Sequence, residues 1–212
     1  MRLGFERYLV CPSCDGSLET LIGERVEERV RYGRLVCECG NTYLIRDYVP
    51  RFAGTDRYVD TFSFQWRKHK LTQLDRDTRR ESEETFRLST GIEPRDLAGQ
   101  LVLDVGCGMG RYADVVSRAG AEVVGIDLSQ AIDVAQENLG SRRDLHLAQA
   151  DVFQLPFRKA MFDCIFSIGV LHHTPDCHKA LLGLIPYLKP GGILAIWVYP
   201  KYKLDMMFRR GT

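Results

Sequence analysis

The chain has 212 residues, of which 45% are hydrophobic, and its 29 basic and 28 acidic side chains leave a net charge of +1. This length suits one large domain with a small one beside it. The near-neutral charge excludes a global field that would draw the protein to nucleic acid. No apolar run reaches the ~18–20 residues that span a bilayer, and the first residues lack a signal-peptide core, so we expect a cytoplasmic protein.

Four of the seven cysteines lie close together near the start of the chain. Cys11 and Cys14 form a CxxC pair, and Cys37 and Cys39 form a CxC pair 22 residues further on. Two such pairs, brought together by a hairpin, predict a tetrahedral zinc site. The CxC spacing departs from the usual CxxC, so a site that has lost its metal is an alternative. A disulfide is another, although the cytosol disfavours it.

A segment of this size has too small a core to be stable alone, and a metal would hold it together. We therefore predict a zinc-ribbon-like β domain over residues 1–52, with a core separate from that of the rest of the chain. Loss of the metal should then loosen this segment and spare the remainder. The other cysteines, Cys107, Cys164 and Cys177, are scattered and are typical of small buried thiols.

Residues 53–98 are polar and charged and are predicted to connect two domains. Residues 72–90 are rich in Arg, Asp and Glu, which favours a solvated helix that Gly91 and Pro94 end. The exception is FSFQWRKHK (62–70), where three aromatic residues precede three basic ones. These aromatics either anchor the segment to the domain or, with the basic residues, stack on RNA.

The most informative stretch is LVLDVGCGMG (101–110), followed by VVGIDLS (123–129). A short apolar run predicts a buried parallel strand. Gly106, Gly108 and Gly110 then predict a turn that a ligand can approach closely, and a helix from 111 to 119. Asp127 closes the next strand, where a carboxylate can accept two hydrogen bonds from a ribose diol.

The glycine pattern differs from the dinucleotide fingerprint GxGxxG, because the third glycine comes one residue early and Arg111 takes its place. Asp104 also precedes the turn and would sit poorly beside a pyrophosphate. It suits a cofactor with a positive charge and an amine. A simpler role for Asp104 is to cap the turn through its own backbone hydrogen bonds.

Further strands are predicted near 145–149, 162–168 and 191–198, after those near 101–105 and 122–126. Helices between them give a doubly wound, Rossmann-like α/β sheet, for which we infer the strand order 3-2-1-4-5.

Five motifs occur in order: DVGCGMG, GIDLS, QADVFQLPF (149–157), FDCIFSIGVLHHTPD (162–176) and LKPGGILAIWVY (188–199). Together they closely resemble the class I S-adenosylmethionine (SAM)-dependent methyltransferases, of the methyltransferase type 11 group. The resemblance covers roughly residues 99–200 and implies a domain over 99–212. It also implies that the 62–70 stretch forms a lid over the cofactor and substrate.

The resemblance implies a role for each matching residue. The turn would hold the methionine part of SAM, with Asp104 near its amino group, and Asp127 would bind the ribose. Asp151 would take the adenine amino group, although an ordinary Asx turn is its alternative. The full set is Asp104, Gly106, Cys107, Gly108, Gly110, Asp127, Leu128, Asp151, Val152, Ser167, Ile168 and Gly169.

The cysteine segment, over residues 7–52, is similar to the zinc ribbon of small methyltransferase-activator proteins. Similar ribbons precede the methyltransferase domain in many bacterial enzymes, including a ribosomal-RNA guanine methylase. The ribbon implies a domain pairing and a surface that a protein partner could use, but no particular acceptor.

These patterns predict methyl transfer from SAM to a small metabolite, a lipid or a natural-product intermediate. The alternatives are transfer to an RNA base, a non-catalytic adaptor and a nicotinamide oxidoreductase. His172 and His173 follow the fourth strand, where a substrate would lie. His172 is the candidate general base, unless it simply bonds to the backbone.

Members of the resembled family add two more strands after the fifth. Residues 200–212 are too few for a helix and two strands of average length, so we expect the chain to be a fragment that lacks strands 6 and 7. The edge of the sheet would then be uncovered.

Overall fold

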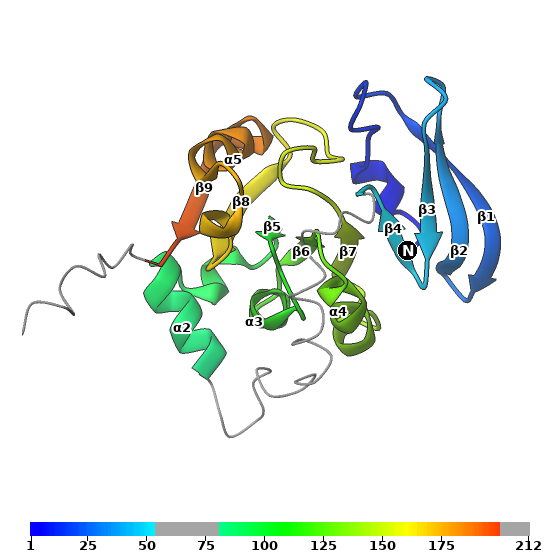
Figure 1. The fold of residues 1–212 in the computed structure, drawn as a ribbon. Helices are drawn as coiled ribbons and strands as arrows, with labels where there is room; N and C mark the ends of the chain where they lie inside the picture. Colours follow the sequence, from blue (N-terminus) through cyan, green and yellow to red (C-terminus); the bar gives the residue numbers. More distant parts are fainter. Residues whose placement is uncertain (54–80, 200–212) are drawn as a thin grey trace, which may run out of the picture.

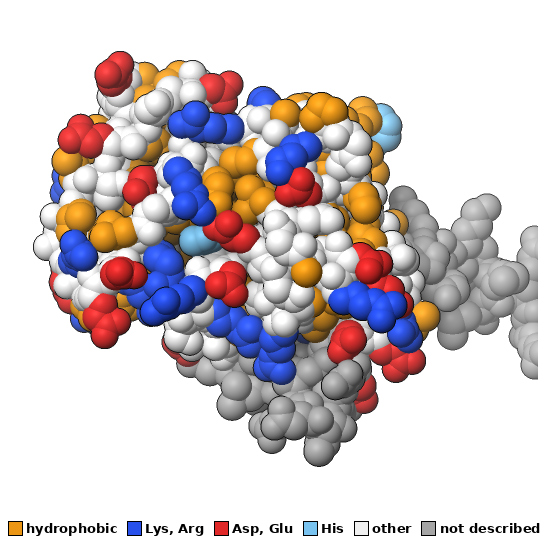
Figure 2. Space-filling model, turned by 180° about the vertical axis from the view of Figure 1, so that it is seen from behind, with side chains coloured by type: hydrophobic (Ala, Val, Ile, Leu, Met, Phe, Trp, Pro, Cys, Tyr) orange, Lys and Arg blue, Asp and Glu red, His pale blue; other side chains and the backbone are white. Residues whose placement is uncertain are grey.

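The computed structural model describes residues 1–53 and 81–199 (Figure 1). In this part of the chain, nine strands form one mixed sheet in the order β1-β2-β3-β4-β7-β6-β5-β8-β9. On the face seen in Figure 2, acidic and basic side chains are interspersed and do not form one basic stripe. None of the helices described is both long enough and apolar enough to cross a membrane.

Five parallel strands make up the α/β part. These are β5 (Leu101–Val105), β6 (Glu122–Asp127), β7 (Leu145–Gln149), β8 (Phe162–Ile168) and β9 (Leu188–Trp197). The helices between them are α3 (Arg111–Arg118), α4 (Ala131–Leu139) and α5 (Cys177–Leu184), with short 3-10 turns η4 (Leu171–His173) and η5 (Ile185–Tyr187) beside α5. The order β7-β6-β5-β8-β9 is the predicted 3-2-1-4-5, so the doubly wound fold is confirmed. The fifth strand begins at Leu188, three residues before the predicted start.

Successive residues of a strand point to opposite faces of the sheet, and each face has its own hydrophobic cluster. Val102 of β5 packs with α3 and α4 on one face. Leu103, the next residue, packs with Leu184 of α5 on the other. Because both faces are covered, the strands read as nearly continuous apolar runs.

The N-terminal segment is a meander that extends this sheet. It contains η1 (Phe5–Tyr8), β1 (Leu18–Val26), β2 (Arg29–Cys37), β3 (Thr42–Arg46) and β4 (Val49–Arg51), and the four strands pair antiparallel in sequence order. β4 then pairs parallel with β7 through Arg51 and Gln149. The segment is therefore the continuation of the α/β sheet.

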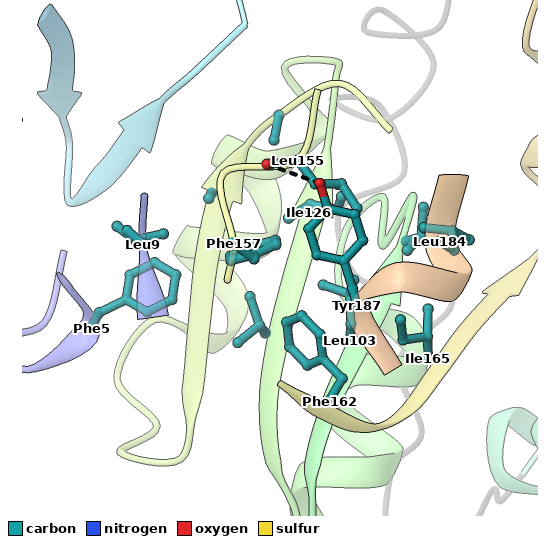
Figure 3. Close-up of a cluster of buried hydrophobic side chains, with 14 of the residues drawn as sticks. Phe5, Leu9, Leu103, Ile126, Leu155, Phe157, Phe162, Ile165, Leu184 and Tyr187 are labelled. Atoms are coloured by element: carbon teal, nitrogen blue, oxygen red, sulfur yellow. Dashed lines mark hydrogen bonds between the residues drawn. The ribbon is translucent and has the colours of Figure 1, made fainter. Parts of the chain in front are cut away.

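The hydrophobic core is shared between the two parts of the chain. Phe5 and Leu9 belong to the same buried cluster as Phe157 and Leu103, and Figure 3 shows them on the side nearest Phe157. Leu9 also forms an isolated antiparallel bridge with Phe157. The prediction of a separate core for residues 1–52 is therefore wrong. A meander of this size buries its apolar face against the neighbouring sheet, which supplies the core it lacks.

Helix α2 (Glu81–Thr90) packs against the sheet at β8, and the short 3-10 turn η3 (Pro94–Leu97) follows it in the chain. Phe86 is fully buried and packs edge-on against Phe166 of β8, with 5.1 Å between ring centroids. Gly91 ends the helix at a φ of 71°. The helix predicted over 72–90 is thus found for its last ten residues; residues 72–80 and the lid predicted over 62–70 lie outside the described residues.

Candidate functional site

The glycine turn lies between β5 and α3, and all three glycines have positive φ angles that other residues rarely adopt. A Cβ atom on Gly106 would lie 2.4 Å from Val170, and one on Gly110 would lie 2.3 Å from Leu139. No atom of the described residues lies within 4 Å of a Cβ atom placed on Gly108. The two outer glycines are therefore required by packing, whereas Gly108 faces open space that a ligand can enter.

Asp127, at the end of β6, is bonded to the turn. Its Oδ2 accepts a hydrogen bond from the amide of Gly108 at 2.9 Å, and its Oδ1 accepts two from Ser129, at 2.8 Å from the amide and 2.6 Å from the hydroxyl. Burial raises the pKa of Asp127, although these hydrogen bonds lower it. A carboxylate has about four acceptor sites, so three are taken and one is left for a ribose hydroxyl.

Asp104 is a buried carboxyl at the end of β5 with one unsatisfied oxygen. The residue is 2% exposed, and its Oδ2 has no hydrogen-bond partner within residues 1–53 and 81–199. Burial, and secondly the charge of Asp127, raise the pKa of Asp104 well above its usual range. A buried carboxyl of this kind either keeps its proton or ionises against a bound cation. The amino group of a ligand in the open space at Gly108 would provide that cation.

Three other predicted cofactor residues differ in whether their side chains are already buried or hydrogen-bonded within the protein. Asp151 accepts the amide hydrogen of Phe153 at 2.9 Å, which is the Asx turn considered as its alternative. Ser167 is fully buried and its hydroxyl donates to the carbonyl of Val105 at 2.8 Å. Cys107 is also buried. Burial raises the pKa of its thiol, and the charges of Asp104 and Asp127 raise it further. Ser167 and Cys107 therefore support the turn through packing and backbone bonding.

His172 lies beyond β8, in η4, beside an aromatic cluster. Its ring centroid is 4.9 Å from that of Tyr199, which in turn is 4.7 Å from that of Trp197. Both ring nitrogens of His172 are shielded from solvent, and neither has a hydrogen-bond partner among the described residues. Burial, and secondly the charge of His173, lower the pKa of His172. An unprotonated imidazole beside an apolar wall is suited to accept a proton from a substrate.

Sequence reasoning missed the aromatic residues of this site. A Cβ atom on Gly169 would lie 3.8 Å from Tyr199 and 3.9 Å from Trp197, so both rings border the predicted methyl end. Burial raises the pKa of Tyr112 at the start of α3, and the charges of Asp104 and Tyr199 act in the same direction. The motif LAIWVY contains two of these residues, but only the packing of β9 against β8 indicates that they face the site.

The four predicted metal ligands come together at the end of the meander where β1 and β3 begin and β2 ends. The Sγ atoms of Cys11, Cys14, Cys37 and Cys39 all lie within 4.8 Å of one another, and all four thiols are free. Cys11 and Cys39 are 3.7 Å apart and Cys14 and Cys37 are 3.5 Å apart. Zn–S bonds of about 2.3 Å in a tetrahedron place the sulfurs about 3.8 Å apart, so the cluster has the right size for zinc.

The surroundings of the thiols also suit a metal. The hydroxyl of Tyr43 is 3.2 Å from Cys11 Sγ, and the amide nitrogen of Asn41 is 3.4 Å from Cys39 Sγ. A Cβ atom on Gly16 would lie 3.1 Å from Cys14 Sγ, so glycine leaves room for the cluster. The CxC spacing therefore does not prevent the four sulfurs from converging.

Comparison with known proteins identifies the α/β part. Residues 103–196 match the family model described as a methyltransferase domain. This part of the chain is a methyltransferase domain. The match begins within β5, ends within β9 and contains every predicted cofactor residue.

Several curated proteins resemble the methyltransferase domain. The ubiquinone biosynthesis O-methyltransferase of Aromatoleum aromaticum is 38% identical over 100 residues, which are 45% of this chain and 42% of that protein. The tRNA U34 carboxymethyltransferase of Klebsiella pneumoniae is 39% identical over 106 residues, 48% of this chain and 31% of that protein. The chain thus spans less than half the length of these relatives.

Solved structures share the fold. A protein of Methanococcus maripaludis, assigned provisionally to the SAM-dependent methyltransferases, has a TM-score of 0.53 at 18% identity, covering 68% of this chain and 65% of its own. A chain from the complex between the Haloferax volcanii Trm112 methyltransferase activator and its provisionally assigned methyltransferase has a TM-score of 0.50 at 21% identity. That match covers 65% of this chain and 57% of the other.

Proposed function

We propose that the chain is a SAM-dependent methyltransferase that acts on a small molecule. The observation that carries this proposal is Asp104, a buried carboxyl with an unpaired oxygen at the end of β5. A dinucleotide would bring phosphates to this point, where they would meet the carboxyl of Asp104. A cofactor with an amino group would relieve the unpaired oxygen instead.

The residues of the methyltransferase domain fit the rest of such a cofactor. Gly108 leaves open space beside the turn, and Asp127 keeps an acceptor site for a ribose hydroxyl. Leu128 and the Asp151–Val152 turn follow the ends of β6 and β7, where the adenine would lie. Ile168 and Gly169 follow β8 at the methyl end.

When bound, SAM supplies an electrophilic methyl group on a good leaving group, so the protein mainly has to position the acceptor. We propose that Trp197 and Tyr199 hold an apolar or aromatic acceptor by contact with their rings. His172 would take the proton from its hydroxyl as the new O–C bond forms. The O-methyltransferase names of relatives such as that of Aromatoleum aromaticum support an oxygen as the methylated atom.

The first test is calorimetric titration with S-adenosylhomocysteine (SAH) and with NAD(H), followed by assay of labelled methyl transfer to phenols, catechols and lipids. We expect one SAH site per chain, no NAD(H) site, and transfer to a small molecule. Binding of NAD(H) without SAH would overturn the proposal, and SAH binding without transfer to any acceptor would favour the adaptor.

A second candidate acceptor is RNA, because the Klebsiella pneumoniae relative is named for transfer to tRNA. Its physical support is weaker. The net charge is +1, and phosphate recognition needs several unopposed basic contacts. We therefore expect weak binding of tRNA and rRNA at physiological salt. Tight, sequence-selective binding would reverse the order of the two acceptors.

We further propose that Cys11, Cys14, Cys37 and Cys39 hold one structural zinc ion. The sulfur spacing and the absence of disulfides among these residues support this role. All four positions around the metal would be filled by protein, which is typical of structural rather than catalytic sites.

A further inference from the structure

Arg51 is a buried guanidinium that the last strand of the meander brings to the carboxyl end of β7. Its side chain is 8% exposed, although arginine is rarely buried unless it is paired. β4 and β7 are held together at this point, because the amide of Phe52 donates to the carbonyl of Gln149 at 2.8 Å. This backbone hydrogen bond therefore fixes where Arg51 lies relative to the methyltransferase domain.

The guanidinium has two partners in that domain. Its Nη1 donates to Gln149 Oε1 at 3.1 Å, and its Nη2 forms an ion pair with Asp133 of α4. Arginine can only donate hydrogen bonds, so Gln149 must turn its amide oxygen toward Arg51. Its amide nitrogen then faces the carbonyl of Leu128, to which it donates at 2.9 Å.

These bonds hold the segment from Leu128 to Asp133 at both ends. The segment begins directly after Asp127 and contains Ser129, which bonds to the Asp127 carboxylate through its amide and hydroxyl. It also leads into α4, which starts at Ala131. In the SAM site proposed above, this segment would lie beside the ribose and the adenine.

We propose that Arg51 is a positioning residue for the adenosine half of the cofactor. It acts through Gln149 and Asp133 and does not touch the cofactor. The planar guanidinium is required because it reaches an amide oxygen and a carboxylate at once, which the single ammonium of lysine cannot do with the same geometry. The inference rests on the proposed function, and it gives one residue of the N-terminal meander an indirect role in cofactor binding.

The experiment compares SAH with 5′-methylthioadenosine, which keeps the adenosine but lacks the amino acid, in calorimetric titrations of the whole chain. Arg51→Met should weaken both ligands by the same factor, about ten-fold, as expected for the loss of one positioning interaction. Arg51→Lys should recover part of the loss. Asp104→Asn should weaken SAH and leave 5′-methylthioadenosine unchanged.

Arg34→Met is the matched control, because Arg34 lies on strand β2 of the same meander with an exposed side chain. It should change neither ligand. If Arg51→Met unfolds, Arg51→Lys and Gln149→Met carry the same comparison. Unchanged affinities in folded Arg51 variants, or a loss confined to SAH, would overturn the inference while leaving the proposed function intact. Failure of the wild-type chain to bind SAH would overturn both.

Discussion

The amide of Gly108 donates a hydrogen bond to Asp127 Oδ2 at 2.9 Å, which joins the glycine turn to the end of the neighbouring strand. The turn follows β5 and Asp127 ends β6, so the bond links these two neighbouring strands at their carboxyl ends. Ser129 holds the other oxygen of the carboxylate. Asp127 therefore shapes the site before any ligand arrives, and its substitution should affect the protein as well as the ligand.

Asp127→Ala should weaken SAH binding by roughly 1.5–3 kcal/mol, as for hydrogen bonds to a charged group. It should also lower the melting temperature of the ligand-free chain, because the amides of Gly108 and Ser129 lose their acceptor. Calorimetry and thermal unfolding measure the two effects. Asp144→Ala is the control, since Asp144 is exposed before β7. An unchanged dissociation constant for Asp127→Ala would falsify the ribose assignment.

Asp104→Asn should stabilise the ligand-free chain as the pH rises. Burial, and secondly Asp127, raise the pKa of Asp104 in the folded state, whereas the unfolded carboxyl ionises at its ordinary value. Between these two values the folded protein binds more protons than the unfolded chain, so wild-type stability falls with increasing pH. The variant lacks this penalty. The melting temperature of the variant should therefore exceed that of the wild type at pH 8 but not at pH 4.

The same carboxyl should make SAH binding by the wild type pH-dependent. Asp104 must lose its proton to pair with the amino group of the ligand, so affinity should rise with pH through the raised pKa. Asp104→Asn should bind SAH weakly and with a flat profile. A wild-type affinity that stays constant between pH 5 and pH 8 would argue that the amino group lies elsewhere.

The sequence predicts the α/β strands well because their apolar runs end at glycine or at an acidic residue. Leu101–Val105 and Phe162–Ile168 have the predicted bounds. The pairing of β4 with β7 could not be predicted in this way. β4 has only three residues, one of them Pro50, and a single registered pair joins it to β7. The hydrophobic periodicity of a sequence reports local structure and does not indicate which distant strands pair.

In the candidate site, too, some residues can be predicted from the local sequence, whereas others depend on tertiary packing. Asp104, Asp127 and the glycines can be found because the turn fixes their spacing. The engagement of Asp127 by Ser129, only two residues away, has a local signal in the motif IDLS that sequence reasoning did not use. Trp197 and Tyr199 reach the site only through the packing of β9, so their role depends on tertiary structure.

His172→Gln should reduce the turnover number about 100-fold or more, as for loss of a general base, and leave the SAH dissociation constant unchanged. The wild-type rate should fall as the pH drops through the pKa of His172, which burial, and secondly His173, lower below its ordinary value. The variant should lack this acidic limb. His178→Gln, on the exposed side of α5, is the control and should behave as wild type. Equal turnover in both variants would remove His172 from the chemistry.

Removal of zinc should destabilise the whole chain, because the meander and the methyltransferase domain share a sheet and a buried cluster. Val10 lies between Leu9 and Cys11, one of the proposed zinc ligands, and the amide of Val10 donates to the carbonyl of Pro156 at 2.9 Å. Loosening of the cysteine cluster should therefore reach the segment of the domain that contains Phe157. Reduced wild-type protein purified without added metal should contain one zinc per chain by elemental analysis.

Cys14→Ser should lose most of that zinc and lower the melting temperature of the entire chain by several degrees, since about 1 kcal/mol shifts a domain of this size by about 2–4 °C. The unfolding of the two parts should stay a single transition, because Phe5 and Leu9 cannot leave the shared cluster without exposing Phe157. Cys177→Ser is the control, because Cys177 lies outside the metal cluster at the start of α5. Full zinc content in Cys14→Ser would refute the ligand set, and two separate transitions would refute the shared core.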